Sequence, residues 1–391
     1  MENAQKAYGM HDAIQISVNA DADRAMHVEY DSFFPFEYWN AGASWCLLPI
    51  YEYWQCYGNI QIPINDYMRI ENLQPILSVC DGGLTDREFA DLKARGYLDL
   101  EKDILLPLLT KQANFWEQIV TPRYYTDKNG NACHDESKTA LEEGEKYIIL
   151  PAYSPENNPI GYLSTLTANA TMDISAARDG LDMLCQVEQA VGRAGHEKAV
   201  ERWQQLKNQI SDYIYDKDGA LREWAMSEYL ENNNHRHLSH LYVAWPAYET
   251  QKNPALAKAA NIALNNRNEY NTDDATAGHG WIHKAFVFSN TGEIEILPAL
   301  PSKWQSGEVT GLMSRSRAEI TKLTWDSGQH TALVTLTSNK KQNQIQLRCG
   351  QPWSSAVTDG RKLPVFTDEA GSYVKLNLEE QESTTVQFIL L

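Results

Sequence analysis

Three histidines and an arginine lie within six positions of one another, in the run NHRHLSHLY at positions 234–242. Side chains of these types can bind a metal ion, hold an anion, or line a polar pocket for a ligand with many hydroxyl groups. They can also form the solvated face of a helix start, with Leu238, Leu241 and Val243 facing the protein behind them. The run by itself leaves these alternatives open.

A second stretch, PAYSPENNP at positions 151–159, encloses a single carboxylate between prolines. Pro155 fixes its own φ and restricts Ser154, so the loop presents Glu156 in a narrow range of directions. General acid catalysis on a sugar needs a carboxyl group held in this way beside histidine, arginine and aromatic side chains. The acid protonates the leaving oxygen while the aromatic side chains hold the ring. The two stretches together predict a site for sugar chemistry.

The runs HRHLSHLY and SPEN resemble glycoside hydrolase family 95, the family of α-L-fucosidases and α-L-galactosidases. A third run, NTGEIEILPALP at positions 290–301, is similar to the family's passage into its C-terminal β-domain. The three motifs occur in the family's order. The resemblance implies inverting hydrolysis of terminal α-L-fucosides, or of related L-sugars such as α-L-galactosides, in oligosaccharides or glycans. It implies no cofactor.

The resemblance also assigns roles to residues. Glu156 matches the general acid, and a tryptophan-rich helix start contributes to the family's sugar pocket, although simple core packing is the alternative for such residues. The residues assigned to substrate binding are Trp39, Trp45, Asn157, His235, Arg236 and His237. Because a general acid must keep its proton, we expect Arg236 to bind the sugar or another acid without holding Glu156 as an anion.

Two parts of the family pattern are missing from this sequence. One is the Asn-x-Asn motif that helps to activate water, with the β-domain and first barrel helices around it. The other is the segment with the Asp-Gly-Asn motif of the proposed base, since Trp281 to Ala285 run directly into Phe286. No base is assigned, and Asp273 and Asp274 are no more than a guess. We therefore expect slow or no turnover by this chain alone, together with self-association or weakly cooperative unfolding.

Two other classes of function compete with this prediction. One is a non-catalytic carbohydrate-binding remnant that keeps the pocket walls. The other is a metal-dependent hydrolase that uses His235, His237 and His240, although no acidic fourth ligand follows at a fixed spacing. The six cysteines form no CxxC pair, and the Asn-Gly hairpin at 124–131 lacks the ligand pattern of a calcium loop. We predict no metal site.

The elements that must position these residues follow from periodicity. Apolar stripes predict helices at about 42–57, 85–95, 99–119, 171–192, 200–218 and 253–267, with Thr171 and Asn253 as N-caps and a kink or break at Pro107. From Ala285 onward the apolar period is two, which predicts an antiparallel β-sandwich. Pattern alone therefore predicts an α domain followed by a β domain.

The family resemblance refines that fold class to α+β multidomain. It implies a partial (α/α)6 toroid of antiparallel helices in residues 1–285 as the catalytic domain, and a C-terminal antiparallel β-sandwich in 286–391. The net charge of −18 argues against nucleic acid and anionic membrane surfaces as partners, and suits a neutral fucosylated oligosaccharide. No apolar run approaches the ~20 residues of a membrane span. The resemblance implies an extracellular or periplasmic location, although no signal peptide is visible.

Overall fold

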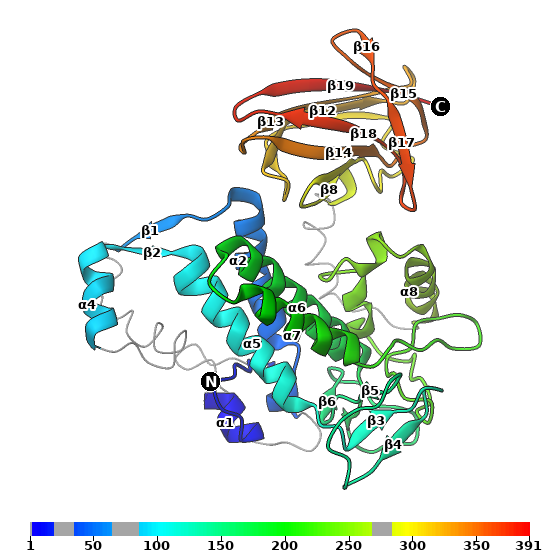
Figure 1. Cartoon of the computed structure of the whole chain (residues 1–391). Coiled ribbons are helices and arrows are strands. Elements are labelled where there is room, and N and C mark those ends of the chain that lie inside the picture. Colours follow the sequence, from blue (N-terminus) through cyan, green and yellow to red (C-terminus); the bar gives the residue numbers. More distant parts are fainter. Residues whose placement is uncertain (1, 19–34, 65–85, 268–283) are drawn as a thin grey trace. The chain divides into compact units, whose positions relative to one another are not determined.

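A computed structural model describes residues 2–18, 35–64, 86–267 and 284–391 of the chain (Figure 1). The chain divides into two units. Unit 1 comprises Met1–Tyr51 and Ile60–Tyr270, and unit 2 comprises Glu52–Asn59 and Asn271–Leu391. Unit 1 contains most of the described helix, and unit 2 is built mainly of strands. The fold is therefore mixed helix and sheet, with a sheet-rich C-terminal region.

Long helices form the body of unit 1. The described α-helices are α1 (Glu2–Tyr8), α2 (Gly42–Tyr57), α4 (Asp86–Arg95), α5 (Leu106–Ile119), α6 (Thr171–Val191), α7 (His196–Gln209) and α8 (Pro254–Asn266). In Figure 1, α5, α6 and α7 lie side by side, and α6 packs against both neighbours. The predicted stripe of α6 is buried, with Ile174, Leu181 and Leu184 fully inaccessible to solvent. Burial of this stripe orients α6 in the unit.

Helix boundaries follow local chemistry more closely than the apolar stripes do. Asn253 caps α8 as predicted, because its side chain accepts the Leu256 backbone N–H at 3.0 Å and Pro254 occupies the first turn. Thr171 is instead the first residue of α6, and its hydroxyl donates to the Arg222 carbonyl at 2.6 Å. The prediction of Thr171 as a capping residue was therefore wrong.

One further helix agrees with the prediction and another differs from it. The stretch at 99–119, predicted to kink or break at Pro107, is divided into a π-helical turn, η2 (Leu100–Leu105), and α5, and Pro107 lies in the first turn of α5. A proline is tolerated there because no intrahelical partner needs its missing N–H. α7 ends at Gln209, and Ile210 is extended and forms a bridge with Tyr147. The apolar residues beyond Gln209 were therefore wrongly placed in this helix.

Short strands and turns connect the helices of unit 1. The strands are β1 (Gln61–Pro63), β2 (Tyr97–Asp99), β3 (Tyr124–Thr126), β4 (Ala132–His134), β5 (Lys146–Tyr147), β6 (Ala152–Tyr153) and β7 (Leu166–Thr167), and the 3-10 turns are η1 (Phe36–Tyr38), η3 (Ser239–Val243) and η4 (Glu249–Gln251). β6 pairs antiparallel with β7, and Ala152 and Tyr153 are fully buried. The loop that carries Glu156 therefore leaves directly from a buried strand.

Two sheets make up most of unit 2, and Figure 1 shows them as two layers. The first has the order β10-β12-β13-β19-β15-β16, with β11 beside β12, and the second has the order β17-β18-β14-β9-β8. Their strands are β8 (Val287–Asn290), β9 (Glu293–Ile296), β10 (Ser306–Val309), β11 (Leu312–Met313), β12 (Ala318–Asp326), β13 (Thr331–Ser338), β14 (Asn343–Cys349), β15 (Trp353–Thr358), β16 (Arg361–Lys362), β17 (Val365–Asp368), β18 (Gly371–Leu378) and β19 (Ser383–Leu390).

The core of unit 2 lies between these sheets. It includes Ile294 and Leu347 from the second sheet, and Val334 and Phe388 from the first, all of them buried. These positions belong to the period-two pattern, so the alternation correctly identified the inward-facing residues. One detail was wrong, because β9 runs parallel to β14 while the other pairs in these two sheets are antiparallel.

Some predictions fall on residues 1, 19–34, 65–85 and 268–283, which lie outside the described part. They include Thr85 at the start of the predicted helix 85–95, and Asp273 and Asp274 as guesses for the base. Within the described residues, none of the helices combines the length and the apolar character needed to cross a bilayer.

Candidate active site

The loop around Glu156 is fastened to one buried carboxylate. The Ser154 hydroxyl donates to Glu223 Oε1 at 2.6 Å, and the Asn157 amide Nδ2 donates to Glu223 Oε2 at 2.6 Å. Ser154 and Glu223 are fully buried, and Asn157 nearly so. Because Ser154 and Asn157 flank Glu156 in the chain, Glu223 holds the loop on both sides of the candidate acid.

Arg267 balances the charge of Glu223. Its Nη2 donates to Glu223 Oε2, and neither side chain is accessible to solvent. The same nitrogen lies 3.2 Å from His240 Nδ1. Burial, and then the positive charge of Arg267, lower the pKa of His240 to about 3, so its ring is neutral at physiological pH. A neutral ring with a free nitrogen lone pair can accept a hydrogen bond from the arginine.

The backbone of the loop is also held by the histidine run. His237 Nδ1 lies 2.9 Å from the Pro155 carbonyl oxygen, and the Ser239 hydroxyl donates to the same oxygen at 3.3 Å. A carbonyl oxygen only accepts hydrogen bonds, so His237 carries a proton on Nδ1. The two motifs are therefore joined in space, although about 80 residues separate them in the chain.

Glu156 itself forms an ion pair with Arg236. Their side chains are 21% and 43% exposed, so solvent reaches both partners. This contact differs from the expectation that Arg236 binds the sugar or another acid, because its guanidinium bonds to the Glu156 carboxylate instead. The expectation followed from the protonation that catalysis requires, whereas an arginine within reach of a free carboxylate pairs with it.

Two polar atoms beside this pair have no hydrogen-bond partner within the described part of the chain. They are the Tyr153 hydroxyl, on a fully buried side chain, and His235 Nε2. Burial, followed by His237, Arg267 and Arg236, lowers the pKa of His235 to about 4. Its neutral ring meets the His237 ring edge to face, with the ring centres 5.0 Å apart. Unpaired polar atoms of this kind suit a ligand with many hydroxyl groups.

The predicted tryptophans lie together near the tail of the histidine run. The Trp39 and Trp45 ring centres are 5.9 Å apart, and Trp45 lies edge to face with Tyr242 at 5.6 Å and with Trp245 at 5.4 Å. Trp245 is 39% exposed. This cluster brings the start of α2 to the end of the histidine motif. Both a stacking wall and simple core packing are consistent with it.

Sequence reasoning did not identify the residues that hold the loop. Glu223 and Arg267 were not named as site residues, nor was Asn232, whose amide donates to Asn157 Oδ1 at 3.0 Å and whose carbonyl accepts from Arg267 at 2.7 Å. One signal was available for Glu223. It is a carboxylate between the apolar residues Leu221 and Trp224, outside any helix, and such a carboxylate requires a partner when buried.

The geometry gives the metal-dependent alternative no support. Within the described ranges, no group of three histidine, cysteine or acidic side chains is placed to hold a metal ion. His240 is nearly inaccessible and faces a cationic arginine, while His237 contacts a backbone carbonyl through Nδ1. A zinc site needs these ring nitrogens to converge on one point.

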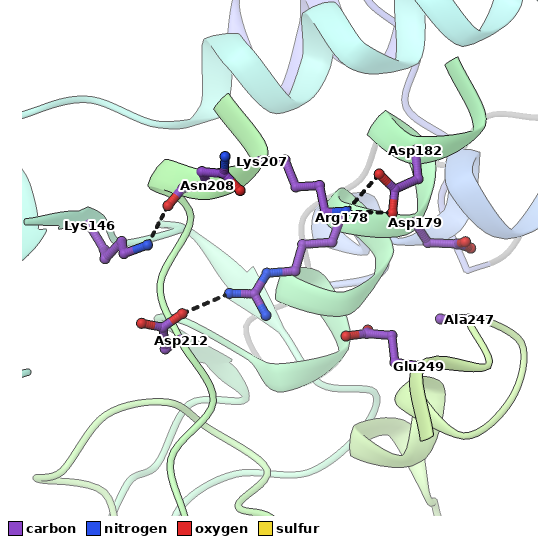
Figure 2. A pocket seen from close by; sticks show the side chains of 9 residues that line it. All are labelled: Lys146, Arg178, Asp179, Asp182, Lys207, Asn208, Asp212, Ala247 and Glu249. Atoms are coloured by element: carbon purple, nitrogen blue, oxygen red, sulfur yellow. Dashed lines mark hydrogen bonds and ion pairs between the residues drawn. The ribbon is translucent and has the colours of Figure 1, made fainter. Parts of the chain in front are cut away.

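Unit 1 also contains a polar cavity of about 250 Å³, away from Glu156 and the histidine run. Figure 2 shows its lining residues, which are Lys146, Arg178, Asp179, Asp182, Lys207, Asn208, Asp212, Ala247 and Glu249. Its cations bond to protein groups: Lys207 to Asp182 at 2.6 Å, Arg178 to Asp212 at 3.1 Å, and Lys146 to the Asn208 carbonyl. None of the predicted site residues lines this cavity.

Comparisons with known proteins agree with the motifs. The model of the glycosyl hydrolase family 95 catalytic domain matches residues 100–295, and the model of the family's C-terminal domain matches residues 288–386. The protein named Alpha-L-fucosidase 2 of Arabidopsis thaliana is 28% identical over 136 residues, which is 34% of this chain. The match spans only 15% of the length of that curated relative.

Two solved structures were also found. One is a family 127 β-L-arabinofuranosidase from Geobacillus stearothermophilus T6, with 9% identity, a TM-score of 0.34, and coverage of 82% of this chain and 61% of that one. The other is a further family 127 β-arabinofuranosidase, with 9% identity, a TM-score of 0.31, and coverage of 99% and 74%.

Proposed function

This chain belongs to glycoside hydrolase family 95, and from that premise we propose that it is an inverting glycosidase acting on terminal α-L-fucosides or related L-sugars. The observation that carries the proposal is the placement of Glu156. Its loop is held by a buried carboxylate and by the histidine run, beside unpaired polar atoms on Tyr153 and His235.

In the proposed reaction, Glu156 gives its proton to the glycosidic oxygen as the bond from that oxygen to the anomeric carbon breaks. A water molecule attacks the anomeric carbon from the opposite face of the sugar and passes its proton to a base. This attack inverts the configuration of the anomeric carbon. The base has no assignment, and the guesses Asp273 and Asp274 lie outside the described residues. An inverting pair of carboxyl groups is about 6.5–9.5 Å apart, which leaves room for the water.

Arg236 has to change partner in this proposal. The acid needs its proton when the substrate is bound, so Arg236 leaves Glu156 and donates to sugar hydroxyls, together with His237 and His235. Both partners of the pair are partly exposed, and exposed pairs open at little cost. Trp39 and Trp45 complete the proposed substrate site. Asn157 was predicted to bind substrate, but its buried amide bonds to Glu223 and Asn232 instead, so it holds the loop rather than the sugar.

Three further features are proposed from the family alone. The helices of unit 1 form part of an (α/α)6 toroid, in keeping with the packing of α6 between α5 and α7. The catalytic domain comprises residues 1–285, and the C-terminal β-sandwich comprises residues 286–391. The protein works outside the cytoplasm, on fucosylated glycans.

The test compares Glu156→Gln with Glu136→Gln. Glu136 is a matched control, because it also contacts an arginine and a histidine, Arg123 at 3.0 Å and His134 at 2.9 Å, but on the β3–β4 hairpin. Glu156→Gln should lower the rate on alkyl fucosides by about 10²–10⁴-fold and on activated aryl fucosides far less. Nuclear magnetic resonance should show the β-anomer released first. Equal small losses on both substrates would remove Glu156 from the role.

A second candidate function, carbohydrate binding without turnover, is favoured by the Glu156–Arg236 ion pair, because a carboxylate bonded to a guanidinium is not placed to reach a leaving oxygen. Calorimetric titration with fucose and with an intact fucoside distinguishes the two. Binding of both, with no release of fucose over days, supports binding alone. Release of fucose that Glu156→Gln abolishes supports the hydrolase.

A further inference from the structure

Four residues link the acid loop to the protein interior, and we call them the carboxylate clamp: Glu223, Arg267, Ser154 and Asn157. We infer that Glu223 is a positioning residue, which holds Glu156 at the sugar by fixing the chain on both sides of it. The inference rests on the proposed function, since positioning has meaning only if Glu156 acts on a substrate.

Glu223 is suited to this role because both of its carboxylate oxygens are used. Oε1 accepts from Ser154 at 2.6 Å, and Oε2 accepts from Asn157 at 2.6 Å and from Arg267. Hydrogen bonds to a charged acceptor are shorter and stronger than bonds between neutral groups. A single rigid side chain therefore sets the positions of the residue two before Glu156 and of the residue directly after it.

The clamp is itself fixed to the longest helix of unit 1. The Thr171 backbone N–H, at the start of α6, donates to the Glu223 carbonyl at 2.9 Å. The Glu223 backbone N–H in turn donates to Glu231 Oε2 at 2.9 Å. Both the main chain and the side chain of Glu223 are thus anchored. Because the loop bonds to Glu223 and Glu223 bonds to the start of α6, the loop should move less than a surface turn does.

Arg267 makes the clamp compatible with burial. A charge without solvent or a partner is unfavourable in a protein interior, and Arg267 supplies the opposite charge on a side chain that is equally inaccessible. Arg267 also donates to the Asn232 carbonyl at 2.7 Å, and Asn232 donates to Asn157 Oδ1 at 3.0 Å. Both the oxygen and the nitrogen of the Asn157 amide are therefore held.

Glu223 acts through the loop and has no direct contact with the substrate, because none of its side chain is accessible. Its substitution by glutamine is informative for a geometric reason. Glutamine offers one acceptor oxygen and one donor NH2 group. With its oxygen toward Asn157 and Arg267, glutamine keeps those bonds, and its NH2 group donates to the Ser154 hydroxyl, which then accepts. In this orientation the bonds only lose the strength that the carboxylate charge gave them. In the opposite orientation the NH2 group faces the donors of Asn157 and Arg267, and the loop loses its Asn157 attachment. The shape of the side chain is kept in both.

The experiment uses the full chain and two matched serines. Ser154→Ala removes one bond of the clamp, while the control Ser175→Ala removes an equally buried hydroxyl that donates to Glu249 at 2.5 Å elsewhere in unit 1. Glu223→Gln is the stronger variant. Hydrogen exchange is measured at the Asn157 and Asn158 amides, which bond to Ser154 O and Asn157 Oδ1 at 2.9 Å each.

Exchange at these two amides should become about 10-fold faster or more in Ser154→Ala and in Glu223→Gln. In these variants the loop can open without first breaking the full set of clamp hydrogen bonds, so its open state is more populated. Exchange in α6 should stay the same, and Ser175→Ala should leave the loop unchanged. Unchanged loop exchange in Ser154→Ala would overturn the inference, even if Glu223→Gln fails to fold.

Kinetics then separate positioning from a general structural role. Glu223→Gln should lower kcat by about 10²-fold on alkyl fucosides, where a displaced acid matters, and much less on activated aryl fucosides. In a Glu156→Gln background it should have no further effect. Equal losses on both substrates, or full additivity with Glu156→Gln, would overturn the inference. A wild-type chain that binds neither fucose nor an intact fucoside would refute the proposed function instead, and the exchange data would still decide whether the clamp holds the loop.

Discussion

The site contains two arginine–glutamate pairs that differ in their surroundings. Arg267 and Glu223 are both inaccessible to solvent, whereas Arg236 and Glu156 are 43% and 21% exposed. The buried pair has further bonds to Ser154, Asn157, Asn232 and His240 around it. The buried pair is therefore part of the framework, and the exposed pair is the one whose partners can be exchanged for a ligand.

The difference follows from solvation. Separating a buried pair leaves a charge with neither water nor a partner, while separating an exposed pair returns both charges to water. Glycosidase chemistry needs both properties side by side. The acid must be held in place, and the group next to it must be free to move onto the sugar.

The largest predicted effect comes from breaking the buried pair. Arg267→Met should lower the free energy of unfolding by about 3–5 kcal/mol, because Glu223 is left buried and unpaired. Arg236→Met should change it by only about 0–1 kcal/mol, as is usual for exposed pairs. Urea denaturation of both variants measures the contrast. Equal losses would show that the two pairs do not differ as their exposure indicates.

The next effect concerns the ligand. Arg236→Ala and His237→Ala should each weaken fucose binding by about 1–3 kcal/mol, because sugar hydroxyls lose their partners. Arg202→Ala is a matched control, since Arg202 also forms an exposed pair, with Glu117. Titration calorimetry measures the affinities. Chelators should leave binding unchanged, and loss of binding with EDTA would instead support the metal-dependent alternative.

Sequence reasoning named both residues of the exposed pair as candidates for the site, although not their contact, and it named neither residue of the buried pair. Glu156, Arg236 and His237 stand in short runs of unusual composition, so local chemistry pointed to them. Glu223 and Arg267 lie 44 positions apart, and no local pattern relates them to each other or to the loop. A pairing that exists only after folding leaves no periodic signal in either segment.

The fold shows the same division between local and long-range information. The apolar stripe of α6 and the alternation in unit 2 repeat over many residues, so the sequence predicted which side chains are buried. The predicted end of α7 was wrong because Ile210 forms a bridge with Tyr147. The apolar periodicity of one helix carries no information about such a long-range contact. The parallel pairing of β9 with β14 was missed for the same reason.

Asp173 is a second buried carboxylate to compare with Glu223. Glu223 is paired with an arginine, whereas the side chain bonded to Asp173 is the neutral amide of Asn40. Asp173 is fully buried and accepts from Asn40 Nδ2 at 2.9 Å, and burial raises its pKa to about 8. The folded state then keeps a proton that the unfolded state loses near pH 4. Stability should therefore fall as the pH rises from about 4 to 8, by up to about 1.4 kcal/mol per pH unit.

Asp173→Asn removes one of the carboxyl groups that cause this dependence, so the free energy of unfolding should fall less steeply with pH in the variant. Urea unfolding at pH 5, 6 and 7 measures the slope. Part of the slope should remain in the variant, because burial also raises the pKa of Asp179 to about 8. An unchanged slope would show that Asp173 is ionised in the folded protein and has a stronger partner than Asn40.

The smallest predicted effect tests whether the exposed pair influences the polar atoms beside it. Burial is the main cause of the low pKa of His235, followed by His237, Arg267 and Arg236. Removing the last of these charges in Arg236→Met should raise the pKa of His235 slightly from about 4, and its ring should stay neutral at pH 7. Nitrogen chemical shifts of the His235 ring, followed from pH 3 to 8 in the wild-type protein and in Arg236→Met, measure the titration. A His235 that titrates near its ordinary value in the wild-type protein would mean that water reaches the ring freely, and that the unpaired Nε2 is solvated rather than held ready for a sugar hydroxyl.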